Sequence, residues 1–305
     1  MEKYRNHSTS KTILIYNSVG YFVPLFFKEG IPAYPVYKQI PFFLKVIRKI
    51  LIKLNVSKSL WFDEWKGNLS DIETVIFFST NPFEAVEYIK EKKANVRIIF
   101  WYWNPVFRGI KPAEIPDDLC EKWSFDKNDC MHYGMKYNTT FYFNSIKLPF
   151  AAAVYDIVFV GVDKGRRSAL NKINENISIS GANTHFYIVD DSWSKRTYNG
   201  AFPPISYPNY LELVSKSKAI LDYVQEGQEG LTLRVMESIF FNKKLITNDR
   251  TIILNDFYNA DNIFILDVDN IQNLSTFLNT PYQPINPEIV ERYNFVNWLR
   301  RFFIQ

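Results

Sequence analysis

The segment AILDYVQEGQEGLTLRVMESIFFNKKLITN, residues 219–248, predicts the fold of the second half of this chain. It opens with a short apolar run, 219–223, continues through a polar loop that contains glycines, and becomes amphipathic near residue 231. A second apolar run follows at 244–248. Short apolar runs bounded by turn residues indicate buried strands, and the stretch between them indicates a helix. A strand, a helix and a further strand form one unit of a parallel sheet.

The same alternation extends over the rest of the chain. Further apolar runs of strand length occur at 12–16, 74–79, 96–102, 154–160, 185–190 and 262–267. Helical patterns occur at 81–93, 167–174, 208–216, 230–241 and 292–303. In the first of these helices we expect Asn81 to cap the N-terminus and Pro82 to occupy the first turn. Continuous apolar strands separated by helices indicate parallel sheets that are covered on both faces.

The strand–helix pattern restarts after residue 150, which indicates two domains. The length of 305 residues agrees, at about 150 residues per domain. We therefore expect an α/β protein with two Rossmann-like domains, 1–150 and 151–285, and a cleft between them. The remaining residues, 286–305, are expected to form a helix that returns toward the first domain.

Composition and charge exclude several classes of protein. The chain is 47% hydrophobic and 22% charged, which excludes a disordered or low-complexity protein. Its formal net charge of +4 is too small for a dedicated nucleic-acid-binding protein. Cys120 and Cys130 indicate free thiols in a reducing compartment. Since no signal-peptide layout and no apolar run of spanning length occur, the sequence predicts a cytoplasmic protein.

Two segments of the second half offer groups that suit an anionic sugar ligand. Backbone N–H groups in the first turn of the helix that starts near Leu231 form an anion site. Arg234 is placed to pair with a phosphate, and Glu229 to accept hydrogen bonds from sugar hydroxyls. The second segment is GVDKGRR at 161–167. Its cations oppose the dipole of the helix that follows, which favours an anion there. The candidates in it are Lys164, Arg166 and Arg167 for phosphate, with Gly161 and Gly165 allowing close approach.

The spacing from Glu229–Gly230 to Glu237–Ser238 resembles the Glu–x7–Glu signature of the nucleotide-sugar-binding domain of GT-B glycosyltransferases. The segment NKKLIT, 242–247, is similar to the strand entry that follows the signature in that family, with Asn for Gly and Lys for Pro. The resemblance implies that Glu229 lies near the transferred sugar and that Glu237 binds the ribose. The alternative interpretation is an ordinary amphipathic helix with two exposed glutamates.

From about residue 95 onward, the chain also resembles glycosyltransferases of bacterial polysaccharide gene clusters. The segments that carry this resemblance are WSFDKNDCMHYGMKYN, 123–138, and QEGLTLRVME, 228–237. It implies transfer of a sugar from a nucleotide-sugar donor to a glycan or lipid-linked glycan acceptor of O-antigen, capsule or lipooligosaccharide (lipopolysaccharide) synthesis. A GT-B-fold sugar-nucleotide 2-epimerase and a non-catalytic nucleotide-sugar-binding protein remain as alternatives.

The expected site residues follow from these segments. We assign catalysis to Glu229, Arg234 and Lys164. We assign donor binding to Gly161, Lys164, Arg166, Gly230, Leu231, Thr232, Arg234 and Glu237. Many relatives of the wider fold carry a His after the third strand, where this chain has Trp103–Asn104–Pro105. Asn104 is thus a candidate for an acceptor contact or a base. Asp63, an acidic residue among aromatic ones in LWFDEW, and His132, in DCMHYG, are further candidates for a base. No His or Cys pair with ligand spacing occurs, so we expect no metal and no cofactor besides the donor.

The segment PFFLKVIRKILIKL, 41–54, predicts a basic amphipathic helix. At about 100° per residue, Lys45, Arg48, Lys49 and Lys53 share one arc and apolar side chains fill most of the other. Two interpretations remain open. The helix either lies in the interface of an anionic membrane, as a peripheral contact on the inner face of the cell membrane, or buries its apolar face in the protein core.

Overall fold

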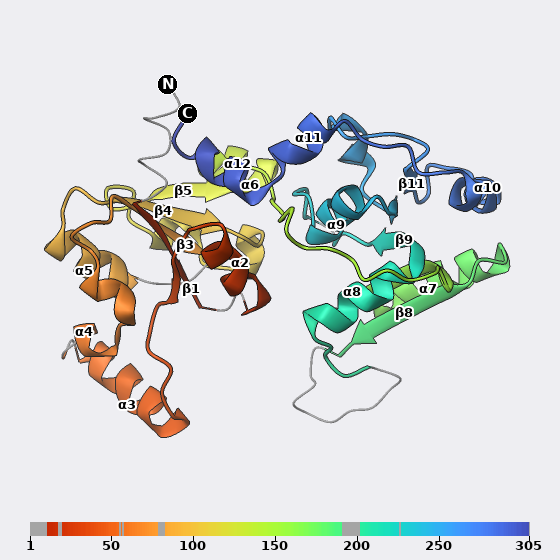
Figure 1. Cartoon of the computed structure of the whole chain (residues 1–305). Helices are drawn as coiled ribbons and strands as arrows, with labels where there is room; N and C mark the ends of the chain where they lie inside the picture. The colour runs from red at the N-terminus through yellow and green to blue at the C-terminus, as the bar shows by residue number, and fades with distance from the viewer. Residues whose placement is uncertain are drawn as a thin grey trace. The chain divides into compact units, whose positions relative to one another are not determined.

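The structure is a computed structural model that describes residues 11–17, 20–54, 56, 58–78, 83–190, 202–225 and 227–304. The chain divides into two compact units (Figure 1). The first unit comprises Met1–Thr139 and Trp298–Gln305, and the second comprises Thr140–Asn297. The division therefore lies at Thr139–Thr140, earlier than the expected position near residue 150.

The first unit is built on a parallel sheet in the order β2-β1-β3-β4-β5-β6. Its strands are β1 (Thr12–Tyr16), β2 (Ala33–Pro35), β3 (Thr74–Phe78), β4 (Arg97–Tyr102), β5 (Glu121–Ser124) and β6 (Lys136–Tyr137). Its helices include α2 (Val23–Lys28), α3 (Phe42–Lys53), α4 (Lys58–Trp61), α5 (Phe83–Lys92) and α6 (Lys127–Tyr133). Short 3-10 helices are η1 (Gly20–Phe22), η2 (Glu64–Gly67), η3 (Val106–Arg108) and η4 (Pro112–Glu114).

Both faces of this sheet are covered, as the continuous apolar strands predict. Side chains alternate along a strand, so Val75 and Phe77 of β3 share one face. They belong to the same apolar cluster as Ile89 of α5. Phe78 of β3 points to the opposite face, where its ring lies 5.7 Å from the ring of Phe26 in α2. Burial on both sides is the arrangement expected of a parallel sheet.

The end of the chain completes the core of the first unit. In α12 (Phe295–Arg301), the ring of Trp298 lies 5.3 Å from the ring of Trp101 in β4. The ring of Phe302 lies 4.8 Å from that of Trp123 in β5. Arg97 adds a hydrogen bond of 2.6 Å from Nη1 to the carbonyl of Phe302. Because of these contacts, Trp298–Gln305 belongs to the first unit, although the preceding residues, up to Asn297, belong to the second.

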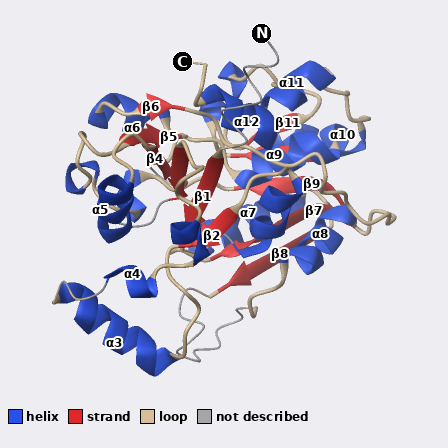
Figure 2. Cartoon of the chain, turned by 60° about the vertical axis from the view of Figure 1, so that its left-hand side comes forward, coloured by secondary structure: helices blue, strands red, loops and turns tan. Residues whose placement is uncertain are grey.

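The second unit is built on a parallel sheet in the order β11-β10-β9-β7-β8. Its strands are β7 (Tyr155–Val162), β8 (Thr184–Val189), β9 (Ser217–Asp222), β10 (Lys244–Thr247) and β11 (Ile263–Ile265). Its helices include α7 (Arg167–Ile179), α8 (Tyr207–Ser215), α9 (Leu233–Phe241), α10 (Leu274–Asn279) and α11 (Pro287–Arg292), with 3-10 helices η6 (Arg250–Leu254) and η7 (Ile271–Asn273). Figure 2 shows strands and helices by colour.

The order of this sheet reverses at β7. The chain first adds β8 on one side of β7, then crosses to the other side and adds β9, β10 and β11 in turn. Helices cover both faces. Ile157 and Phe159 of β7 cluster with Leu170 of α7, whereas Val158 clusters with Val214 of α8. Two parallel sheets, each covered by helices, confirm the predicted α/β class with two Rossmann-like domains.

Most predicted strands and helices agree with the observed ones to within a few residues. The helix expected at 167–174 extends to Ile179, and the single helix expected over 286–305 is two helices, α11 and α12. The predicted helix 81–93 is α5, which the structure describes from Phe83, so the cap at Asn81 and the first turn at Pro82 lie outside the described residues. α9 begins at Leu233, slightly later than expected, because the Thr232 hydroxyl caps it by accepting from the N–H of Val235 at 3.4 Å.

Cys120 and Cys130 are free thiols, and both are buried. Burial raises the pKa of Cys120 to about 12 and that of Cys130 to about 11. Both thiols are therefore protonated near neutral pH, and a protonated thiol is a poor nucleophile. The prediction of unpaired cysteines is confirmed. Within the described part of the chain, no helix is long and apolar enough to span a bilayer.

Candidate functional site

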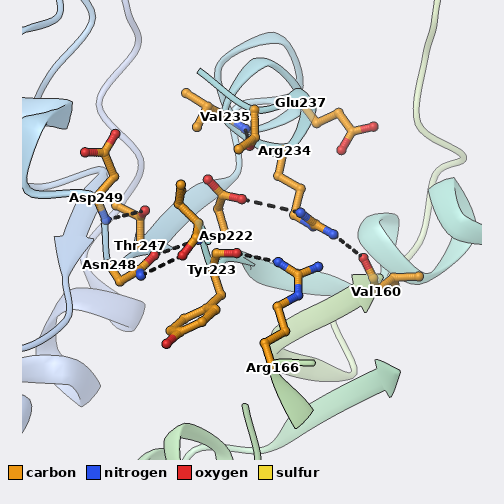
Figure 3. Close-up of polar contacts among 12 residues, drawn as sticks. Val160, Arg166, Asp222, Tyr223, Arg234, Val235, Glu237, Thr247, Asn248 and Asp249 are labelled. Carbon is orange, nitrogen blue, oxygen red and sulfur yellow. Dashed lines mark hydrogen bonds and ion pairs between the residues drawn. The ribbon is translucent and has the colours of Figure 1, made fainter. Parts of the chain in front are cut away.

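The candidate site lies in the second unit, at the carboxyl ends of β7 and β9. These two strands are paired neighbours, and they flank the point at which the sheet order reverses. Ligands of open α/β sheets bind outside the carboxyl ends of the strands at such a switch point. Figure 3 shows the polar side chains that gather there, from β9, from α9 and from the loops that follow β7, β9 and β10.

Two arginines converge on Gly161 near the end of β7. The guanidinium carbons of Arg166 and Arg234 lie 5.2 and 5.0 Å from the centroid of the Phe159 ring. A Cβ atom at Gly161 would lie only 2.5 Å from Nη2 of Arg234 and 3.1 Å from Nη2 of Arg166. Glycine therefore provides the space in which the two guanidinium groups come together, whereas the predicted close approach of a ligand to Gly161 and Gly165 stays a prediction.

Backbone carbonyls hold both guanidinium groups in place. Nη2 of Arg234 donates a hydrogen bond of 2.7 Å to the carbonyl of Val160, and Nη1 of Arg166 donates to the carbonyl of Tyr223 (Figure 3). Two like charges at one point repel each other, and this repulsion is relieved when an anion binds between them. Planar guanidinium forks match the oxygens of a phosphate group. The two guanidinium groups are therefore arranged as an anion would require, and phosphate binding by them stays a prediction.

Asp222 balances one of the two positive charges. It ends β9 and is completely buried, and its Oδ1 lies 3.4 Å from Nη1 of Arg234. Burial raises the pKa of Asp222, while the charge of Arg234 opposes that effect. A buried carboxylate of this kind fixes the direction of the arginine side chain, since leaving either charge unpaired is costly. Asp222 is thus a positioning residue for Arg234.

Loop-to-loop hydrogen bonds fix the backbone around the arginines. Asn248, directly after β10, accepts from the N–H of Val224 at 2.7 Å and donates Nδ2 to the carbonyl of Val224 at 3.0 Å. Gln225 donates Nε2 to the carbonyl of Lys164 at 3.1 Å. The loops after β7, β9 and β10 are therefore tied to one another by side chains that bond to backbone.

The basic residues of the loop at 161–167 have different surroundings. Arg167 pairs with Asp163 at 2.9 Å, and the same carboxylate accepts from the backbone N–H of Arg167 at the start of α7. Lys164 is exposed and has a left-handed φ of 52°. Of the three predicted phosphate ligands, Arg166 is thus the one that the structure brings to Arg234.

The start of α9 lies beside the same loops. Gly230 and Leu231 are buried, and the carbonyl of Leu231 accepts a hydrogen bond of 2.5 Å from the hydroxyl of Thr140. Thr232 caps the helix, and Glu229 is exposed in the loop before it. The exposed position of Glu229 is compatible with the predicted contact to a sugar, which remains a prediction.

Glu237 has different surroundings from those that the resemblance implies. Its side chain is 1% exposed, and its two carboxylate oxygens accept from the hydroxyls of Tyr207, at 3.0 Å, and of Tyr210. Burial raises the pKa of Glu237 to about 7, although the tyrosine hydrogen bonds and the charge of Arg234 lower it. Figure 3 shows its carboxylate turned away from Asp222. The ribose role stays a prediction that would require these hydrogen bonds to be exchanged.

The three candidate residues in the first unit do not form one hydrogen-bonded group in the described structure. Asp63 caps η2 by accepting from the N–H of Glu64 at 2.7 Å. His132 is exposed near the end of α6, with its ring 4.5 Å from that of Tyr133. Asn104 is exposed after β4. No hydrogen bond joins any two of these three residues among those described, and their predicted roles remain predictions.

Sequence reasoning missed Asp222, Phe159 and Asn248. A carboxylate at the end of an otherwise apolar strand, as in AILDY, was an available signal for Asp222. For Asn248 the comparable signal was a polar amide side chain directly after the strand KLIT. Among the described residues, no group of three or more His, Cys, Asp or Glu side chains is arranged to hold a metal ion.

Comparisons with known proteins concern the fold. No family model matches the sequence, and no curated protein matches it. Similar solved structures include HepE of Anabaena in complex with UDP and glucose, with 9% identity and a TM-score of 0.48 over 96% of this chain and 98% of that chain. MnaA of S. aureus with UDP has 11% identity and a TM-score of 0.48 over 96% of each chain. UDP-GlcNAc 2-epimerase of Neisseria meningitidis bound to UDP-GlcNAc has 11% identity and a TM-score of 0.44 over 96% of this chain and 98% of that chain. Identities this low assign no residue roles.

Proposed function

We propose that the second unit binds the diphosphate of a nucleotide-sugar at the β7–β9 switch point. The observation that carries this proposal is the convergence of Arg166 and Arg234 on Gly161. A diphosphate has enough negative charge for both guanidinium groups. The first turn of α9, close to the same loops, adds backbone N–H groups that favour an anion.

We further propose that the chain is a glycosyltransferase. An acceptor hydroxyl oxygen would form a bond to C1 of the sugar, the bond from C1 to the phosphate oxygen would break, and the hydroxyl proton would pass to a base or to solvent. Negative charge then develops on the departing nucleoside diphosphate. Arg166 and Arg234 would stabilise that charge by fixed electrostatic interactions, with Lys164 as a further cation. Glu229 would contact the transferred sugar, and no metal would take part.

Donor binding can be tested by thermal unfolding in the presence of UDP-, GDP- and dTDP-sugars, with CMP-sugars, which have one phosphate and no diphosphate, as a comparison. A ligand at 100 times its Kd stabilises the folded state by about 2.7 kcal/mol. We expect one nucleotide class to raise the melting temperature. In Arg166→Ala or Arg234→Ala, loss of a charge-assisted hydrogen bond of about 1.5–3 kcal/mol should weaken binding about 10- to 100-fold. Arg167→Ala is the matched control, because that guanidinium pairs with Asp163.

The reaction can be tested with water as the acceptor. A transferase should slowly release the nucleoside diphosphate and free sugar from the donor that binds. A sugar-nucleotide 2-epimerase would instead return an intact donor with inverted configuration at C2, which NMR detects. Binding without either change would indicate a non-catalytic binding protein. If no nucleotide-sugar raises the melting temperature, or if the two arginine variants bind as the wild type does, the proposed site is wrong.

A further inference from the structure

The helix α3 presents an apolar stripe to solvent. None of its side chains is fully buried, and several large apolar ones are mostly exposed. The exposed fractions are 81% for Phe42, 63% for Phe43, 45% for Val46, 42% for Ile47, 53% for Ile50 and, directly after the helix, 65% for Leu54. At about 100° per residue these six side chains occupy a continuous arc of about 140°. Among the described residues, the apolar face is therefore not buried in a core, which disagrees with the second of the two interpretations of this segment.

The opposite side of α3 makes the contacts with the protein. Leu44, Arg48 and Ile52 are half-buried, and they recur at the spacing of one helical turn. The guanidinium carbon of Arg48 lies 4.2 Å from the centroid of the Tyr37 ring. Figures 1 and 2 both show α3 next to α4 and apart from the sheet of its unit. The helix thus contacts the protein along one side, and its apolar stripe faces away from those contacts.

Two cations, Lys45 and Lys49, border the apolar stripe on one side, and a third, Lys53, lies just inside the same edge. Lys45, Lys49 and Lys53 are exposed and lie within about 80° of one another on the helix wheel. The segment 41–54 contains no acidic residue. Long lysine side chains beside an apolar surface can keep their ammonium groups in a polar layer while their methylene groups contact apolar atoms. An apolar arc edged by lysines has the layout of a helix that lies in a membrane interface.

We propose that α3 is the membrane-contact surface of this protein and that its partner is a bilayer containing anionic phospholipid. Phe42, Phe43 and Ile50 would enter the boundary between head groups and acyl chains. Lys45, Lys49 and Lys53 would meet the phosphate groups. A second copy of this chain fits the surface less well, because a symmetric pairing would bring the same lysines together. This inference does not rest on the proposed function.

The proposal can be tested by sedimentation of the full chain with liposomes, without any nucleotide-sugar. Vesicles of phosphatidylcholine with phosphatidylglycerol should retain the protein at low salt, and vesicles of phosphatidylcholine alone should retain much less. Each lysine near an anionic surface contributes about five-fold to partitioning. The variant Lys45→Gln/Lys49→Gln/Lys53→Gln should therefore bind about 100-fold more weakly. High salt should weaken wild-type binding, because it screens the same charges.

Matched variants test whether binding to the vesicles depends on the apolar stripe of α3 or on nonspecific adsorption of the protein. Phe43→Ser/Ile50→Ser should lose retention, whereas Ile179→Ser/Lys172→Gln, which changes two exposed residues of α7, should keep it. Circular dichroism and the melting temperature of each variant establish that it is folded. The proposal is overturned if wild-type protein stays in the supernatant at low salt, or if the α3 variants sediment as the wild type does. It is also overturned if light scattering shows that the wild type is a dimer and that the Phe43→Ser/Ile50→Ser variant is a monomer.

Discussion

The pH dependence of folding should reveal the buried carboxyl of Glu237. Burial raises its pKa from 4.5 to about 7, so the folded state holds this proton more tightly than the unfolded state. Stability from this group is complete below about pH 4.5 and is lost as the pH rises through about 7. Each pKa unit corresponds to about 1.4 kcal/mol, so the loss amounts to about 3 kcal/mol between pH 4 and pH 8.

Glu237→Gln removes the titrating group and keeps a similar shape beside Tyr207 and Tyr210. The difference in unfolding free energy between variant and wild type should be near zero at pH 4. At pH 8 it should reach about 3 kcal/mol in favour of the variant. Urea denaturation at several pH values measures this difference directly. Glu175→Gln on α7 is the control for removing one carboxylate from an exposed position. If the profiles of wild type and Glu237→Gln run parallel between pH 4 and pH 8, the burial argument is refuted.

Two further variants examine the arginine site and the loops that support it. Gly161→Ala places a methyl group 2.5 Å from Nη2 of Arg234, which must then move, so the variant should fold but lose most of the thermal shift with the bound nucleotide-sugar. An undiminished shift would contradict the proposed phosphate position. Asn248→Ala removes both side-chain hydrogen bonds to the backbone of Val224, and urea denaturation should show a loss of about 1–3 kcal/mol. A stability equal to wild type would mean that the loop bonds contribute nothing net.

The repeating pattern of apolar strands was sufficient to predict the two parallel sheets. In a parallel sheet the carboxyl ends of neighbouring strands meet at one edge. For this reason Gly161, Arg166 and Arg234, which are far apart in sequence, could be assigned to one site from the sequence alone. Short strands of mixed polarity were missed, because β5 (EKWS) and β6 (KY) have no apolar run.

Side-chain surroundings that depend on another helix were not predictable. α9 looks amphipathic in sequence, yet every residue from Val235 to Ile239 is buried. Glu237 is covered because two tyrosines of α8 meet it, and the spacing within α9 carries no information about α8. The division between the units lies at Thr139–Thr140, because packing, and not the restart of the strand–helix pattern near residue 150, decides which core the residues in between join.

The position of Trp298 and Phe302 has a consequence for biosynthesis. A ribosome releases the chain from the N-terminus, and domains of most multidomain proteins fold in that order. Here the aromatic groups that cover Trp101 and Trp123 emerge only after all of the second unit. The core of the first domain can therefore be completed only after the second domain has been translated. A nascent chain arrested before residue 298 should leave that first domain open to proteases and chaperones while the second domain is already folded.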